Sequence, residues 1–289
     1  MAVLGSTDDV MGQELPGRLE GKLVAGYIVY QGPSLIDGGP IFAVALTETK
    51  NAHTGALVQT YIMRSDQSPM LASKRGTDAS NCGTCPLRGE ATEDPARKTA
   101  KGRLCNIQLY QAPEAIYRAY KRGLYPVVPP DQLGRIRGFL DVRIGNYGDG
   151  SAVPLEVWRA LVGDGRHTAY SHQWSSRPDL VAPGFYMASV ETKEDAQRAR
   201  GMGYTPYRIL KSLDDLDNAT EVLCPKTPEG GASTDCARCM RCHGTSYRKN
   251  GERILGKGIA SVASGSFATS EARAYRKKLK KDQLLQIAV

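Results

Sequence analysis

The chain has 289 residues, of which 41% are hydrophobic and 24% are charged, a composition that is ordinary for a soluble globular protein. No run approaches the roughly 18 consecutive apolar residues of a membrane-spanning helix, and residues 1–21 lack the basic start and apolar core of a secretory signal. We therefore expect a cytoplasmic protein with no membrane partner. The formal net charge of +8 leaves nucleic acid open as a partner.

Residues 1–20 contain Gly, Pro, Ser and Asp without periodicity, which predicts a flexible N-terminus. Segments rich in Val, Ile, Tyr and Thr follow, separated by turn-forming residues, at 23–32, 41–49 and 57–65. They predict an antiparallel β-meander. The polar stretch 66–112 carries the first cysteines, and a loop of this length in a compact domain is normally functional or held in place by something it binds.

From residue 136 onward, predicted strands alternate with predicted helices. The strands are expected at 138–145, 166–174, 184–190, 205–210, 221–225 and 256–265. Such alternation is typical of βαβ units with a parallel sheet. We therefore predict an α/β fold with a partial (βα)6 barrel-like parallel sheet over 136–289. An N-terminal antiparallel β-meander precedes it within 21–135, and each part carries cysteine-rich metal-binding loops.

Two basic segments account for much of the positive charge. One is a predicted helix at 113–123, where Tyr117, Tyr120 and the nearby Tyr125 are candidates for stacking on bases. The other is the last predicted helix, and its basic residues are Arg273, Arg276, Lys277, Lys278, Lys280 and Lys281. A solvated face is the usual role of such a run, and contact with phosphates is the alternative.

The seven cysteines fall into two groups. The first thiol group is Cys82, Cys85 and Cys105, and the second thiol group is Cys224, Cys236, Cys239 and Cys242. A disulfide framework is not expected in a reducing compartment, and an odd number would leave one thiol unpaired. Core cysteines would not recur at CxxC spacing, although that interpretation stays open for Cys105. We expect most of the seven to bind metal.

The second thiol group favours a 4Fe-4S cluster. The spacing of Cys236, Cys239 and Cys242 matches the ligand loop of a ferredoxin cluster, and Cys224, which precedes a proline, is the expected fourth ligand. Zinc is the alternative, because structural zinc sites combine two separate CxxC pairs.

The first thiol group offers three sulfurs and no evident fourth ligand. It is either an open and reactive site or one completed by His53 or by a cysteine of the second group. One or two clusters are therefore expected in the chain.

Polar residues follow the carboxyl ends of the predicted parallel strands, where ligands bind in such sheets. We expect a small anionic or zwitterionic ligand to be bound beside the first thiol group by Arg143, Gly145, Asn146, Tyr147 and Gly148. Asp149, His172 and Glu191 are candidates for acid–base catalysis.

Each of these residues also has a structural interpretation. Asp149 is equally suited to cap a helix, Glu191 to occupy the first turn of one, and His172 to be a core histidine. Arg143 should point away from the outer, apolar face of the sheet and needs an acceptor, for which Asp149 or Glu191 is expected. An internal salt bridge that only ties strands together is the alternative to a ligand site.

The motifs SNCGTCP, VRIGNYGDGSAVP, YSHQW, MASVET and CxxCxxCHG resemble those of a family of uncharacterised proteins of phages and bacterial accessory genomes, over about residues 50 to 265. That resemblance implies no activity; for a phage protein it implies the host cytoplasm.

More distantly, the arrangement resembles radical S-adenosylmethionine enzymes. These have a partial six-stranded barrel, an open three-cysteine cluster before it and often a further cluster after it. The resemblance implies S-adenosylmethionine as a cofactor, held by the segment from Gly145 to Asp149. The chain departs from the usual CxxxCxxC triad, because Cys105 lies far along the chain from Cys85.

Three functions follow from these patterns. The first is an iron–sulfur enzyme, either radical S-adenosylmethionine-like or a relic redox enzyme. The second is a zinc- or cluster-stapled nucleic-acid-binding protein that acts in phage replication or regulation. The third is a structural or host-interaction protein with inert metal sites. Polar residues at strand ends favour the first function, and the basic tail favours the second.

Overall fold

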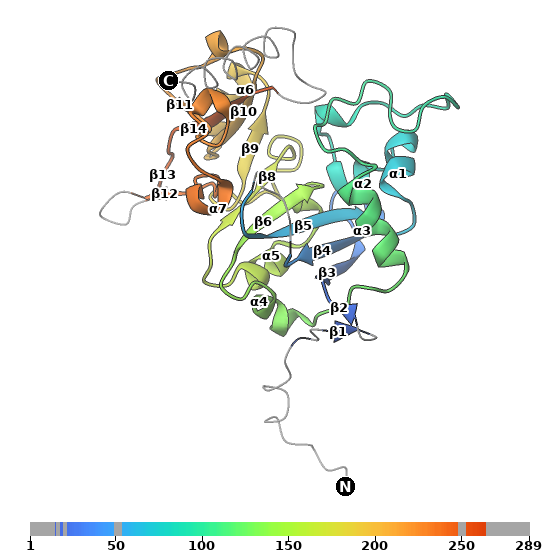
Figure 1. The fold of residues 1–289 in the computed structure, drawn as a ribbon. Helices are drawn as coiled ribbons and strands as arrows, with labels where there is room; N and C mark the ends of the chain where they lie inside the picture. Colours follow the sequence, from blue (N-terminus) through green and yellow to red (C-terminus); the bar gives the residue numbers. More distant parts are fainter. Residues whose placement is uncertain (1–14, 16–17, 20–21, 49–53, 248–252, 264–289) are drawn as a thin grey trace, which may run out of the picture.

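The computed structural model describes residues 15, 18–19, 22–48, 54–247 and 253–263 (Figure 1). Most of the predicted flexible N-terminus, His53 and the whole predicted basic helix at 273–283 lie outside these residues.

A first five-stranded sheet combines antiparallel and parallel pairing. Its spatial order is β3 (Gly26–Pro33), β4 (Pro40–Leu46), β5 (Leu57–Arg64), β6 (Asp141–Tyr147) and β7 (His167–Thr168). β3, β4 and β5 pair antiparallel, which confirms the predicted meander. β6 and β7 continue the sheet parallel to β5, so the pairing crosses the boundary predicted between residues 135 and 136.

A second five-stranded sheet is entirely parallel. Its spatial order is β8 (Tyr170–Ser171), β9 (Met187–Val190), β10 (Pro206–Leu210), β14 (Gly258–Val262) and β11 (Glu221–Leu223). Only Ala169 separates β7 from β8, so residues 167–171 join the two sheets. The Ala169 N–H donates to the carbonyl of Cys242 at 3.2 Å. The predicted parallel sheet is therefore confirmed.

Helices cover both faces of the first sheet (Figure 1). One side carries α1 (Pro69–Arg75), α2 (Ala79–Cys82) and α3 (Ala112–Lys121). The other side carries α4 (Leu133–Ile136) and α5 (Leu155–Val162). Phe42 packs in the core under α3, whereas Ile41 and Trp158 of α5 share the opposite core. Burial on both faces explains why β4 is apolar throughout. β5 is buried almost throughout as well, although it contains Gln59 and Thr60.

The barrel is not confirmed. In the described part of the chain, the edge strands β3 and β11 do not pair with each other. Three crossovers in the described residues contain a helix of two turns or more: α3 between β5 and β6, α5 between β6 and β7, and α6 (Lys193–Gly201) between β9 and β10. The connection at 172–186 holds two prolines, and the one at 211–220 is a polar capped turn, so neither forms an α-helix.

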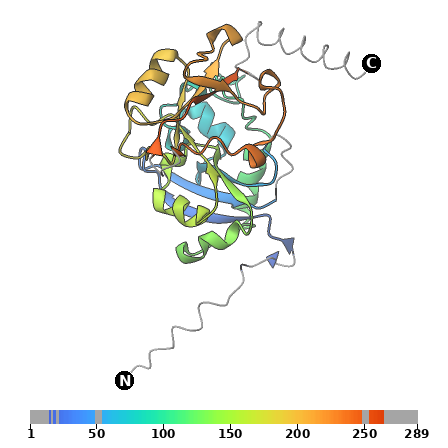
Figure 2. The same cartoon turned by 90° about the vertical axis from the view of Figure 1, so that its left-hand side faces the viewer.

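The connection from β11 to β14 carries the second cysteine loop. It contains α7 (Cys236–Cys239), and it places β14 between β10 and β11. Viewed from two sides, the second sheet and α6 lie at the end of the molecule remote from β1 and β2 (Figures 1 and 2). The remaining short elements are β1 (Arg18–Leu19), β2 (Lys22–Leu23), β12 (Ser246–Tyr247), β13 (Arg253–Ile254), and the 3-10 turns Pro86–Arg88, Pro130–Gln132, Gly150–Ala152, Leu213–Asp215 and Pro228–Gly230.

Candidate functional site

All seven cysteines line one cavity of about 890 Å³. They are free thiols, and each is partly accessible rather than fully buried. Residues of the parallel strands β6, β7, β8, β9 and β10 also line the cavity. A volume of this size is typical of small-molecule sites. The fold therefore brings the two thiol groups, which are far apart in the sequence, to the same space.

A tight turn after α2 positions Cys82 and Cys85. α2 ends at Cys82, and the N–H of Cys85 donates to the Cys82 carbonyl at 3.2 Å. Gln173, fully buried after β8, donates to the same carbonyl at 3.3 Å and accepts from the N–H of Thr84 at 3.3 Å. A Cβ on Gly83 would meet the Gln173 side chain at 2.2 Å, so glycine is required there. Gln173 thus anchors the CxxC turn, a role that the sequence interpretation did not assign.

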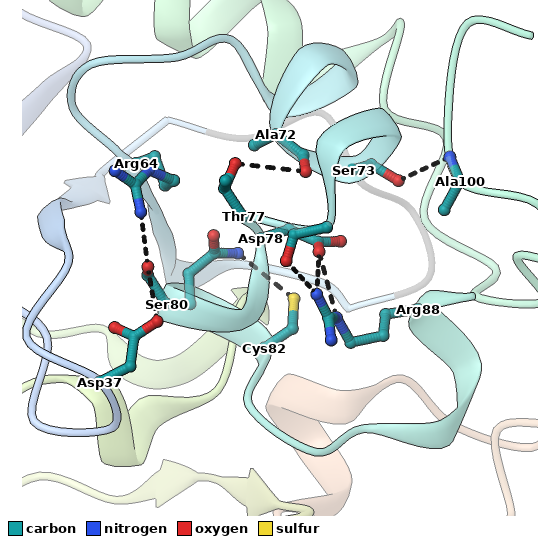
Figure 3. A network of polar contacts seen from close by, with 12 residues as sticks. Asp37, Arg64, Ala72, Ser73, Thr77, Asp78, Ser80, Cys82, Arg88 and Ala100 are labelled. Carbon is teal, nitrogen blue, oxygen red and sulfur yellow. Dashed lines mark hydrogen bonds and ion pairs between the residues drawn. The ribbon is translucent and has the colours of Figure 1, made fainter. Parts of the chain in front are cut away.

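Arg88 fixes the other side of this turn (Figure 3). Its guanidinium donates to the buried carboxylate of Asp78 at 2.6 Å. Burial raises the pKa of Asp78 despite this pairing. Beside it, the Asn81 amide donates to the sulfur of Cys82 at 3.3 Å. The turn therefore offers both charge and hydrogen bonds to the first thiol group.

Cys105 returns to this turn through backbone pairing. Its N–H donates to the carbonyl of Leu87 at 2.9 Å, and Glu90 pairs with Lys101. Burial, followed by the neighbouring Asp78, Cys85 and Cys105, raises the pKa of Cys82 well above its usual value. The structure thus brings the three members of the first thiol group together.

The second thiol group surrounds the one-turn helix α7. Asp235 caps this helix by accepting from the N–H of Arg238 at 2.9 Å. Cys224 is held at the end of β11 by a hydrogen bond from its N–H to Ala260. Burial, with contributions from Cys224 and Cys236, raises the pKa of Cys242 to about 12. The four thiols of the second group therefore lie near one another.

Arg143 lies in the cavity, on the side of β6 opposite to Val142 and Ile144, which belong to the core under α5. Its Nε donates to Asn146 Oδ1 at 3.1 Å, and its guanidinium lies 5.4 Å from the ring centre of Tyr170. The expected partners were wrong: within the described residues, neither Asp149 nor Glu191 forms an ion pair with Arg143.

Electrostatics place Arg143 beside the second thiol group. Burial alone would lower the pKa of Arg143, but Tyr170, Cys236 and Cys242 raise it. Arg143 in turn opposes the rise in the pKa values of Cys236 and Cys242. We expected the first thiol group as its neighbour, so this placement differs from the prediction.

Two glycines shape the end of β6. Gly145 and Gly148 both have positive φ angles, and a Cβ on them would lie 2.6 Å and 2.7 Å from backbone carbonyl oxygens. The resulting bulge directs Asn146 to the hydroxyl of Tyr61 at 2.6 Å. Burial, followed by Cys82, raises the pKa of Tyr147 well above its usual value. The end of β6 thus lines the cavity that both thiol groups share.

Asp149 is fully engaged in hydrogen bonds. One carboxylate oxygen accepts from the N–H and hydroxyl of Ser151, at 3.1 and 2.8 Å. The other accepts from the hydroxyl of Ser171 and the N–H of His172, at 3.0 and 2.8 Å. Asp149 therefore caps the turn after β6 and ties it to the end of β8. This geometry favours the capping interpretation over acid–base catalysis.

His172 connects the cavity to Glu191. Its Nε2 lies 2.9 Å from Glu191 Oε1 and 3.9 Å from the sulfur of Cys85. Burial opposes protonation of the ring, but Cys85 and Glu191 outweigh it and raise the pKa of His172 well above its usual value. Because both neighbours face the same nitrogen, the three residues do not form a relay through the two ring nitrogens.

The tyrosines proposed for base stacking are partly buried against the core under α3. Tyr120 stacks on Phe42 with ring centres 3.8 Å apart, and Tyr117 and Tyr125 pack against the same core. The face of Tyr120 is therefore covered. Phosphate contacts by the helix at 273–283 stay a prediction, because that helix lies outside the described residues.

The donor geometry bears on the type of metal. Across the described ranges, no three His, Cys, Asp or Glu side chains are grouped closely enough to bind a single metal ion. A zinc ion at about 2.3 Å from each sulfur needs such a compact set. In a 4Fe-4S cluster each thiolate binds a different iron, so the sulfurs stand further apart. No described thiol group is therefore compact enough for a zinc tetrahedron, and binding of a cluster stays a prediction.

Comparison with protein-family models, curated proteins and solved structures gave no match for this chain. In the part of the chain that the structure describes, no helix has the length and apolar character needed to cross a membrane.

Proposed function

We propose that the protein is an iron–sulfur protein with two cluster sites and a ligand cavity between them. The second thiol group supplies four ligands and forms a closed site. The first thiol group supplies three ligands and leaves one position open. The observation that carries this proposal is that all seven cysteines line a single cavity.

The grouping of the thiols around one cavity supports metal binding, whereas their burial opposes it by favouring the protonated thiol over the thiolate that binds metal. Burial raises the pKa of Cys82, Cys105, Cys224, Cys236 and Cys242. Thiols are weak hydrogen-bonding groups, so seven of them around one cavity are poorly suited to satisfy polar groups there. A bound metal stabilises the thiolate form and couples the folding of both cysteine loops to its own binding.

The cavity walls supply the groups that such a site needs. An iron with an open position can bind a small molecule or pass an electron to it. His172, supported by Glu191, holds or moves a proton beside the first thiol group. Arg143 adds positive charge beside the second group. We regard the protein as a redox enzyme, either radical S-adenosylmethionine-like or a relic of that type.

We further propose that the parallel strands curve around the cavity as a partial barrel. Arg143 of β6, Thr168 of β7, Ser189 of β9 and Tyr207 of β10 all line the same cavity. Side chains from strands this far apart in a sheet meet around one space when the sheet curves about it. That shared lining supports a barrel-like curvature around the ligand.

Anaerobic purification followed by iron, sulfide and zinc analysis tests the proposal. Two 4Fe-4S clusters predict about eight irons and eight sulfides per chain, with a visible absorption band that fades on reduction. A stoichiometric amount of zinc without iron, or less than half an equivalent of any metal, would contradict it.

A further inference from the structure

Arg143 and Thr168 face the cavity side by side. They are register partners on the parallel strands β6 and β7, so their side chains emerge from the same face of the sheet. Both line the cavity. Their position is therefore fixed by the sheet and does not depend on either cysteine loop.

The hydroxyl of Thr168 has no hydrogen-bond partner within the described residues, although only 2% of the residue is exposed. Burying a polar group without a partner is unfavourable, and such groups are normally satisfied by protein, water or a ligand. Because the Thr168 residue lines the cavity, rotation of its side chain can turn the hydroxyl toward a group that is bound there.

The two terminal guanidinium nitrogens of Arg143 are available to bind a ligand. Its Nε is held by Asn146, and Tyr170 packs against the guanidinium plane. The two terminal nitrogens form no hydrogen bond or ion pair with any residue that the structure describes. Two parallel N–H groups of a guanidinium match the two oxygens of a carboxylate.

The charge of the cavity agrees with an anion. Its lining contains five basic side chains but two carboxylates, Asp78 and Asp149. Arg88 pairs with Asp78, and four hydrogen bonds occupy Asp149. A ligand ammonium group would therefore find no uncommitted carboxylate in this lining.

From these contacts we infer that Arg143 and Thr168 form the binding subsite for the carboxylate of a small organic acid, beside the second thiol group. The guanidinium binds both carboxylate oxygens, and the Thr168 hydroxyl donates a further hydrogen bond to one of them. The rings of Tyr170 and Tyr207 lie edge to face with their centres 4.9 Å apart, and both residues line the cavity next to this subsite. The inference rests on the proposed function for what the acid does there, but not for its binding.

Equilibrium binding of benzoate to the anaerobically purified full chain tests this subsite, with iron measured on the same samples. Benzamide has the same shape without the charge, and inorganic phosphate is an anion without the planar carboxylate. We expect benzoate to bind at least tenfold more tightly than either. Thr168→Val keeps the shape of the side chain and should weaken benzoate binding about tenfold, and Arg143→Met about a hundredfold.

Arg198→Lys is the matched control, because Arg198 lies over Trp174 in a similar cation–π contact outside the cavity. It should leave benzoate binding unchanged. Equal binding of benzoate and benzamide, tighter binding of phosphate, or unchanged benzoate binding by both cavity variants would overturn the inference.

The outcome separates the inference from the proposed function. Benzoate binding that depends on Arg143 in a protein without iron supports the subsite and refutes the cluster proposal. A different outcome would be normal iron content without benzoate binding, together with a shifted reduction potential in Arg143→Met. It would show that Arg143 only neutralises the second thiol group.

Discussion

The two thiol groups meet at one cavity but have different surroundings. The first has three sulfurs, and its neighbours are the titratable groups His172, Tyr147 and Asp78. The second has four sulfurs, and its neighbours are the cation Arg143 and the ring of Tyr170. The difference supports the proposed division of roles, in which the first group would react and the second group would hold charge and a ligand.

Removing one sulfur from each group is the strongest way to break this comparison. Cys242→Ala and Cys82→Ala should each remove one metal centre and leave the other, which halves the iron content. Cys242→Ala should also lower solubility most, because folding of the β11–β14 connection is coupled to its metal. Metal analysis with thermal unfolding measures both effects. Unchanged iron and melting temperature in either variant would show that the group is not a unit.

Gln173 allows the first thiol group to be perturbed alone, because its hydrogen bonds reach the turn at Cys82 and Cys85 but not the second thiol group. Gln173→Met keeps the size of the side chain but leaves the buried polar groups of the CxxC turn without partners. We expect the free energy of unfolding to fall by about 2–3 kcal/mol. The iron of the first group should be lost more readily to a chelator, while that of the second should not. Equal loss from both groups would place Gln173 in a general structural role.

A substitution of Asp149 tests whether this residue stabilises the strand end by hydrogen bonds or acts in acid–base catalysis. Asp149→Asn replaces one acceptor oxygen by a donor, which opposes two of its four hydrogen bonds. If Asp149 holds the strand end in place, the free energy of unfolding of this variant should fall by about 1–3 kcal/mol in chemical denaturation. Ser176→Ala, on the loop beyond, is the control and should change stability little. A variant as stable as the natural chain would revive the catalytic interpretation.

The ion pair of His172 with Glu191 should have the smallest effect. Both side chains are partly exposed, at 19% and 24%, and such pairs contribute about 1 kcal/mol or less. Glu191→Gln should therefore change the melting temperature little and leave the iron content intact. A large loss of iron would mean that Glu191 orients the first group.

Much of the fold follows from local patterns in the sequence. The meander could be predicted because its strands are rich in β-branched residues and its turns are explicit. The grouping of the cysteines was visible in their spacing. The pairing of β5 with β6 was not, because the long polar segment 66–112 intervenes and no local signal records which strand edge a distant strand joins.

Long-range contacts also decided the roles that the sequence left open. Asp149 was equally compatible with a cap and a catalyst until Ser171 was placed beside it. Gln173 stands next to His172 in the sequence, but nothing local shows that its amide reaches the turn at Gly83. Arg143 was expected to face a carboxylate, and the fold places it against Tyr170 instead.

Electron paramagnetic resonance of the reduced protein, with and without added cyanide, tests the division of roles most directly. Two cluster signals are predicted. Cyanide should alter one of them, because in the proposed function only the three-thiol site would leave an iron open to an added ligand. The cyanide-sensitive signal should vanish in Cys82→Ala and persist in Cys242→Ala. Two signals that both ignore cyanide, or a single signal lost equally in the two variants, would contradict the account.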